Sequence, residues 1–90
     1  PPEVCEQIRQ NVTTHPGVHQ VHNIRTRYSG SQLCVDLHVV VDSEMSVYEG
    51  HRVAEQIKGL LLHQGPEILD VEVHIEPVEV ALSDRECRRL

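Results

Sequence analysis

The sequence is poor in aromatic residues: it contains no Phe, no Trp and only two Tyr. Its core must therefore be built from aliphatic side chains, and 90 residues allow one modest core at most. No apolar run approaches the roughly 20 residues that a membrane helix needs, and no secretory signal is visible. These absences predict one small domain without a membrane segment of its own.

Basic residues are also scarce, with 8 Lys and Arg against 14 Asp and Glu and a net charge of -6. A nucleic-acid surface would need a basic stripe, so we expect no nucleic-acid partner.

The three cysteines are odd in number and lack C-x-x-C spacing, which argues against a disulfide framework. Because no Ser-His-Asp motif, Cys-His motif or glycine-rich phosphate loop is present, we do not expect an enzyme. What the sequence has in excess is histidine, with seven residues.

Hydrophobic periodicity predicts five elements in the order helix, strand, strand, helix, strand. Their predicted ranges are 2–14, 18–28, 32–41, a helix from Ser46 to the Gly65-Pro66 pair, and 69–76. A right-handed crossover through the second helix would lay the third strand parallel to the second. The fold class is therefore predicted to be α+β, an αββαβ sandwich with a three-stranded mixed sheet and two helices on one face.

Local patterns support three of these elements. In a regular first strand, Val18 and Ile24 would face one side of the sheet and Val21 the other, because side chains alternate. A bulge that shifts the alternation would bring these apolar residues to the same side, so we predict a bulge in this strand. The Ser46-to-Glu49 spacing matches a capping box and predicts the start of the second helix. The third strand alternates, with aliphatic residues on one side and polar residues on the other. One face of the sheet is thus left uncovered, and dimerisation would enlarge this small core.

The polar face of the predicted sheet carries the candidate functional residues. His38 lies on the second strand and His74 and Glu76 on the third, while His22 on the first strand can pair near His38. His51 lies in the second turn of the second helix. Imidazole and carboxylate together suit zinc and neighbouring divalent ions. An exposed strand histidine is more often plain surface, and no compact motif such as H-E-x-x-H is present, so both interpretations stay open.

Other polar residues have plainer interpretations. His15, His19 and His63 are interpreted as surface residues, the last at a helix end where a cation is favoured. Cys34 is interpreted as a small packed residue in preference to a ligand. Asp36 is either a support for a neighbouring histidine or solvated charge.

Five stretches also match one family pattern in order and spacing along roughly residues 3–78. They are HPGV (15–18), VHNIRTR (21–27) followed by Gly30, DLH (36–38), MS (45–46) with GHRVA (50–54), and DVEVHIEP (70–77). Together they resemble the C-terminal cytoplasmic domain of cation diffusion facilitator transporters.

That resemblance implies a ferredoxin-like, metallochaperone-like fold and a homodimer in which divalent metal at the dimer interface regulates transport. Position by position, His22 and His38 match the ligands of one ion, and His51 and His74 match those of a second. Glu76 matches the acidic residue shared by the two ions. The favoured ion is Zn²⁺, with Fe²⁺ and Mn²⁺ as alternatives.

The resemblance further implies a cytoplasmic domain of an integral membrane protein, joined to a transmembrane exporter domain absent from these residues. We predict a metal-binding and dimerisation domain over 1–78 and a flexible tail over 79–90. Gly50 departs from the family, which often has Ala at this position, and Gly favours a looser helix. A free-standing metal-binding or metallochaperone domain is the alternative function.

Overall fold

The structure is a computed structural model that describes residues 2–64 and 67–78. Five elements follow one another along the chain: α1 (Pro2–Thr13), β1 (Val18–Ser29), β2 (Gln32–Val41), α2 (Val47–Leu62) and β3 (Ile68–Pro77). Their order and type are as predicted, and β2 has the predicted bounds. The tail expected over 79–90 lies outside the described residues. Neither helix combines the length and apolar character that crossing a bilayer requires.

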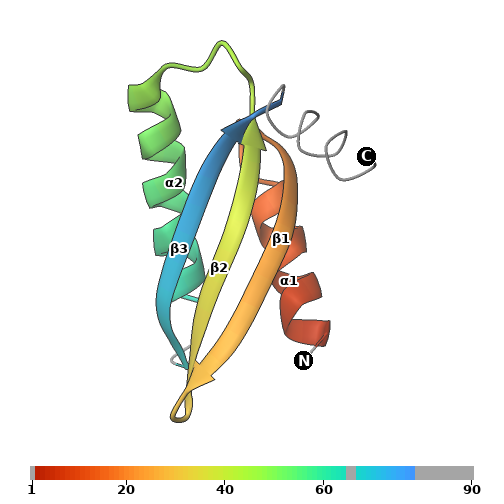
Figure 1. Cartoon of the computed structure of the whole chain (residues 1–90), viewed down its shortest axis with the longest axis vertical. Coiled ribbons are helices and arrows are strands. Elements are labelled where there is room, and N and C mark those ends of the chain that lie inside the picture. The colour runs from red at the N-terminus through yellow and green to blue at the C-terminus, as the bar shows by residue number, and fades with distance from the viewer. Residues whose placement is uncertain (1, 65–66, 79–90) are drawn as a thin grey trace, which may run out of the picture.

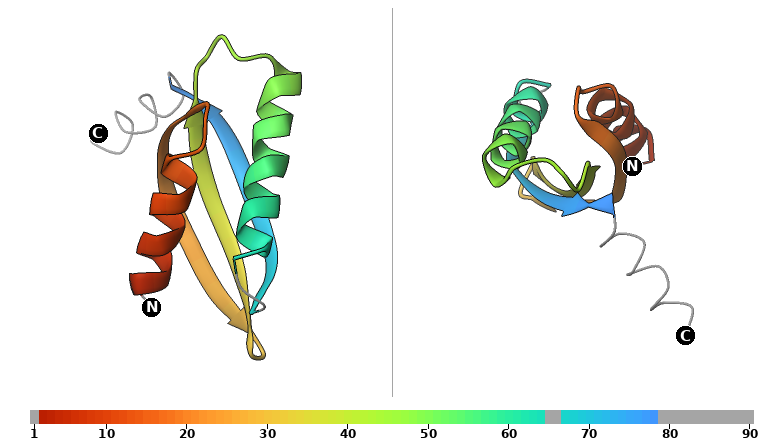
Figure 2. Two further views of the ribbon diagram at one scale, coloured as in Figure 1. Left: turned by 180° about the vertical axis from the view of Figure 1, so that it is seen from behind. Right: turned by 90° about the horizontal axis from the view of Figure 1, so that it is seen from above.

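The three strands form one mixed sheet in the order β1-β2-β3. β1 runs antiparallel to β2, and β3 runs parallel to it, which confirms the predicted crossover through α2. Both helices lie on the same face of the sheet, so the molecule has two layers (Figures 1 and 2). Among the described residues, no helix covers the opposite face. The predicted ferredoxin-like αββαβ sandwich is therefore confirmed.

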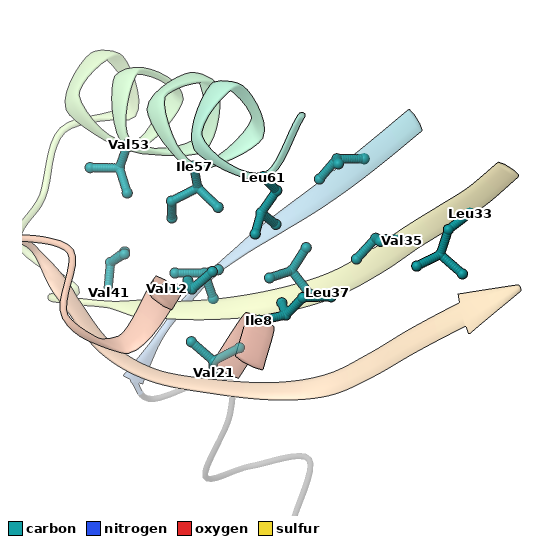
Figure 3. Close-up of a cluster of buried hydrophobic side chains, with 12 residues drawn as sticks. Ile8, Val12, Val21, Leu33, Val35, Leu37, Val41, Val53, Ile57 and Leu61 are labelled. Carbon is teal, nitrogen blue, oxygen red and sulfur yellow. The ribbon is translucent and has the colours of Figure 1, made fainter. Parts of the chain in front are cut away.

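The core between these layers is entirely aliphatic. Ile8 and Val12 from α1 and Ile57 and Leu61 from α2 are fully buried, and they meet the fully buried Leu37 in the middle of β2 (Figure 3). Their helical spacing and the alternation along β2 direct these side chains to one interior. The opposite face of β2 consequently carries Cys34, Asp36 and His38, followed by the buried Val40.

The bulge predicted in β1 is present, and a second one accompanies it. The pairing with β2 shifts between Val18 and Gln20 and again between His22 and Arg25. In the second shift, Asn23 takes a φ of 56°, a conformation that Asn tolerates better than most residues. Each shift inserts one unpaired residue and so reverses the alternation. This is how Val18, Val21 and Ile24, spaced three apart, all reach the core side.

Helix α2 begins as predicted and ends earlier. The Ser46 side chain is the N-cap and accepts a hydrogen bond from the Glu49 backbone N–H at 3.0 Å. The helix ends at Leu62 with His63 as its C-cap, ahead of the Gly65-Pro66 pair, which lies outside the described residues. In the sequence, Val47 repeats at near-helical spacing with Ala54, Ile57 and Leu61, which predicts that it belongs to the apolar face of the helix, but it is 92% exposed. That part of the prediction is wrong, because Val47 is the first helical residue and lies beyond the packed turns.

The glycine at position 50 gives a test of helix stability. A Cβ added to Gly50 would meet Ile75 Cγ2 at 3.7 Å, an ordinary van der Waals distance. Gly50→Ala is therefore expected to raise the free energy of unfolding by about 0.5–1 kcal/mol, because Ala restricts the unfolded chain and favours the helix. Urea denaturation followed by circular dichroism measures this.

The matched control is Gly17→Ala. Gly17 has a φ of +91°, which an L side chain rarely adopts, so this substitution should lower the free energy of unfolding. A loss of stability in Gly50→Ala, or equal effects at both positions, would contradict the assignment.

Candidate metal centre

Three histidines form a line across the uncovered face of the sheet. His22 on β1 pairs with His38 on β2, and His38 pairs in turn with His74 on β3. The rings of His22 and His38 are stacked with centroids 5.7 Å apart, and those of His38 and His74 are 4.8 Å apart. We call these three residues the histidine row. The row confirms that all three strands direct a predicted site residue to one face.

Glu76 completes this cluster from the next outward-facing position of β3. Its Oε1 is hydrogen bonded to Nδ1 of His38, in the middle of the row. Its other oxygen, Oε2, lies 3.7 Å from Nε2 of His22, on the far strand. The Glu76 side chain is only 13% exposed although it carries a carboxylate. One acidic side chain on β3 thus reaches histidines from both other strands.

Two polar atoms of this cluster have no partner. Within the described part of the chain, His22 Nε2 and Glu76 Oε2 are both buried and form no hydrogen bond. Each buried polar atom left unpaired lowers the free energy of unfolding by roughly 1–3 kcal/mol. Two such atoms that face each other therefore need a structural explanation. Two ligands of a tetrahedral zinc ion, with bonds of about 2.0–2.2 Å, lie about 3.4 Å apart. The 3.7 Å separation of these atoms is close to that value.

His74 is flanked by two further carboxylates. Its Nε2 lies 2.8 Å from Asp36 Oδ1 and 3.7 Å from Glu72 Oε1. The Asp36 contact is close, but its atoms are not aligned as a hydrogen bond, and Asp36 Oδ1 is otherwise unpaired. Asp36 therefore lies in contact with His74, the placement that the first of its two roles considered from the sequence requires. Glu72 was not singled out from the sequence, although alternation along β3 places it on the same side of the strand as His74 and Glu76.

His51 lies apart from the other four predicted ligands. It is exposed on α2, and both helices lie on one side of the sheet (Figure 2). The histidine row lies on the other side. His51 lines a groove of about 500 Å³ together with Ile75 and Pro77 of β3. Because His74 and Glu76 are the chain neighbours of Ile75 on the opposite side of the sheet, the edge of β3 separates His51 from them. The structure thus brings four of the five residues together.

The remaining histidines are placed as the sequence suggested. His19 is exposed, and His63 caps the end of α2 with its Nδ1 2.8 Å from the Gly59 carbonyl. His15 Nδ1 lies 2.8 Å from the Pro16 carbonyl. Among the described residues, no three His, Cys, Asp or Glu side chains already have the donor arrangement of a closed metal site. Side-chain movement or further ligands are therefore part of any metal binding here.

The sequence and the fold of this chain match one family of domains. The model of the cation efflux protein cytoplasmic domain matches residues 1–78. This chain belongs to that family. Among its curated relatives, Metal tolerance protein C1 of Arabidopsis thaliana is 36% identical over 83 residues, which are 92% of this chain and 18% of that protein. The cation-efflux pump FieF of Yersinia pestis (strain Pestoides F) is 36% identical over 85 residues, 94% of this chain and 28% of that one.

Solved structures of the same kind confirm the fold of this cation efflux domain. A Met-to-Leu variant of the MamM C-terminal domain has a TM-score of 0.80 and 28% identity, covering 84% of this chain and 95% of that chain. A nickel form of a Glu-to-His variant of the same domain has a TM-score of 0.81 and 25% identity, covering 86% and 98%. This chain spans less than a third of the length of the curated relatives.

Proposed function

We propose that this cation efflux domain is the regulatory part of a divalent cation exporter, and that it binds divalent metal and dimerises to control transport. The observation that carries the proposal is the pair of buried, unpartnered atoms His22 Nε2 and Glu76 Oε2. A cation between them would satisfy both atoms and offset the negative charge of Glu76. Export itself would be carried out by a transmembrane exchanger of cations for protons elsewhere in the same protein.

The donor set fits a borderline divalent ion. His22, His38 and Glu76 would hold the first ion through imidazole nitrogen and carboxylate oxygen, the ligands that zinc accepts. Fe²⁺ and Mn²⁺ accept the same donors, and affinity alone does not separate them. A bound ion here would supply charge and geometry to the domain, with no bond made or broken.

A second ion is proposed at the edge of β3. His74 and Glu76 face one side of this strand, and His51 lies beside Ile75 on the other. An ion bound over the strand edge could take ligands from both sides, with the Ile75 carbonyl as a further oxygen donor. This site requires a change in the His74 side chain, which now points to Asp36.

Dimerisation is proposed to use the uncovered face of the sheet. Helices cover one face of the three strands (Figure 2), and the histidine row lies on the other. A metal ion on that face lies where a second copy would pack, so binding would favour the compact dimer over an open one. This is a population shift, and its size equals the difference in metal affinity between the two states.

The test is a zinc titration of the full 90-residue chain, followed by calorimetry and small-angle scattering. The unsubstituted chain should bind zinc and become more compact, and His74→Ala should weaken the second binding step at least about tenfold. His19→Ala, an exposed histidine on β1, is the control and should bind as the unsubstituted chain does. His51→Ala should remove the second binding step alone.

Three outcomes would overturn different parts of the proposal. If no zinc, ferrous or manganous ion binds, the metal site is wrong, and if binding ignores His74, the second ion is wrong. If ions bind but neither particle size nor association changes, the regulatory role is wrong.

A further inference from the structure

The uncovered face carries a second pattern, beside the histidine row, that the metal site does not use. Arg25 on β1 pairs with Asp36 on β2, which pairs with Glu72 on β3. In the next row, Arg27 and Asp70 hold the corresponding outer positions, with Cys34 between them. Two arginines therefore stand along one edge of this face and two carboxylates along the other.

The two arginines have no carboxylate partner in the described part of the chain. Among the described residues, neither Arg25 nor Arg27 lies within 4 Å of a carboxylate. Both arginines are exposed, as are Asp70 and Glu72. Two strand spacings of about 4.8 Å hold the opposite charges roughly 10 Å apart, and a trough of about 320 Å³ lies between them. The face is thus polarised from one edge to the other.

This uneven distribution of charge favours one orientation of the two-fold axis in a face-to-face dimer. If two copies pack face to face about a two-fold axis parallel to β2, then β1 of each copy lies opposite β3 of the other, so arginines meet carboxylates twice. If the axis instead crosses β2, each strand meets its own copy, and arginines meet arginines. Like charges brought together in this way repel each other and disfavour the wrong arrangement.

We infer that Arg25 and Arg27 pair with the partner's Asp70 and Glu72, and that these contacts set the dimer axis parallel to β2. The inference rests on the dimer of the proposed function and assigns its orientation to residues that are not proposed as metal ligands. It has one further geometric consequence. Residues of the central strand lie nearest the axis, so Cys34 faces the partner's Cys34.

Charge reversal tests the pairing, by sedimentation of the full 90-residue chain with zinc and with a chelator. Arg25→Glu with Arg27→Glu, or Asp70→Arg with Glu72→Arg, should weaken association at least about 100-fold. Combining all four substitutions reverses both edges and should restore association to within about tenfold of the unsubstituted chain. Arg52→Glu, on the opposite layer, is the matched control and should leave association unchanged.

The possible outcomes separate the two proposals. An unsubstituted chain that stays monomeric with zinc and with chelator overturns the dimer of the proposed function, and this inference with it. An intact dimer whose association ignores the charge reversals, or is not restored by the four combined, overturns this inference alone. Circular dichroism of each variant identifies any that fail to fold, and the fourfold variant then decides the pairing.

A cross-link checks the axis by an independent route. With Cys5 and Cys87 replaced by Ser, a bismaleimide with a spacer of roughly 10 Å should join Cys34 to the partner's Cys34, since face-to-face sheets are about 10 Å apart. A chain that keeps only Cys5, on α1 in the helical layer, is the control and should remain uncross-linked. Equal cross-linking at both positions, or none at Cys34, would overturn the assigned axis.

Discussion

Glu76→Gln is expected to lower zinc affinity by at least about 100-fold while leaving the metal-free domain equally stable or more stable. Removing even a supporting partner of a metal ligand typically costs about 10–100-fold, and Glu76 is proposed as a direct ligand. Without metal, Glu76 Oε2 is buried and unpaired, so this oxygen of the carboxylate is desolvated without a compensating hydrogen bond. Replacing the carboxylate by a neutral amide is expected to raise the free energy of unfolding by up to about 1–2 kcal/mol.

The opposite signs of these two effects make the prediction specific. Calorimetric zinc titration measures the first, and urea denaturation with a chelator measures the second. Glu72→Gln is the control: it lies on the same face of β3 but is 72% exposed, so both quantities should stay nearly constant. If Glu76→Gln destabilised the metal-free domain and left zinc binding intact, Glu76 would be a structural residue.

Leu37→Ala is expected to produce the largest loss of stability among single core substitutions. Leu37 is fully buried at the centre of β2, where side chains from both helices meet it (Figure 3). Truncating a buried Leu costs about 2–5 kcal/mol, because apolar contacts are lost and a cavity remains. Domains are typically stable by only about 5–15 kcal/mol, so this one substitution removes a large share.

Urea denaturation at one protein concentration, with a chelator present, measures this loss without a contribution from metal binding. Leu60→Ala on α2 is the matched control, because Leu60 is 44% exposed and should cost no more than about 0.5 kcal/mol. A cost for Leu37→Ala below about 1 kcal/mol, or equal to that of Leu60→Ala, would mean that the core does not centre on β2.

Much of the fold follows from short-range patterns. The alternation along β2, the helical spacing of Ile8 and Val12, and the capping box at Ser46 each depend on residues within a few positions of one another. Val21 would face the opposite side of a regular strand from Val18 and Ile24, and this was enough to predict one bulge in β1, although not the second. Such signals are reliable because side-chain direction repeats with the local backbone.

The site was less accessible to the same reasoning. Placing His74 and Glu76 on one face required only the alternation of β3. The approach of Glu76 to His22, across two strands, depends on the pairing register of both neighbours and on the bulges in β1. The separation of His51 from the row depends on which face of the sheet α2 covers.

The sequence by itself determined the order of the elements, the aliphatic core, the polar face of the sheet and the residues that stand on it. Only the tertiary structure decided that His22, His38, His74 and Glu76 meet, that His51 lies apart from them, and that Arg25 and Arg27 stand opposite two carboxylates. The physical reason is that periodicity fixes the direction of a side chain along its own strand. Strand order and register instead depend on contacts between residues far apart in the sequence, and these decide which side chains become neighbours.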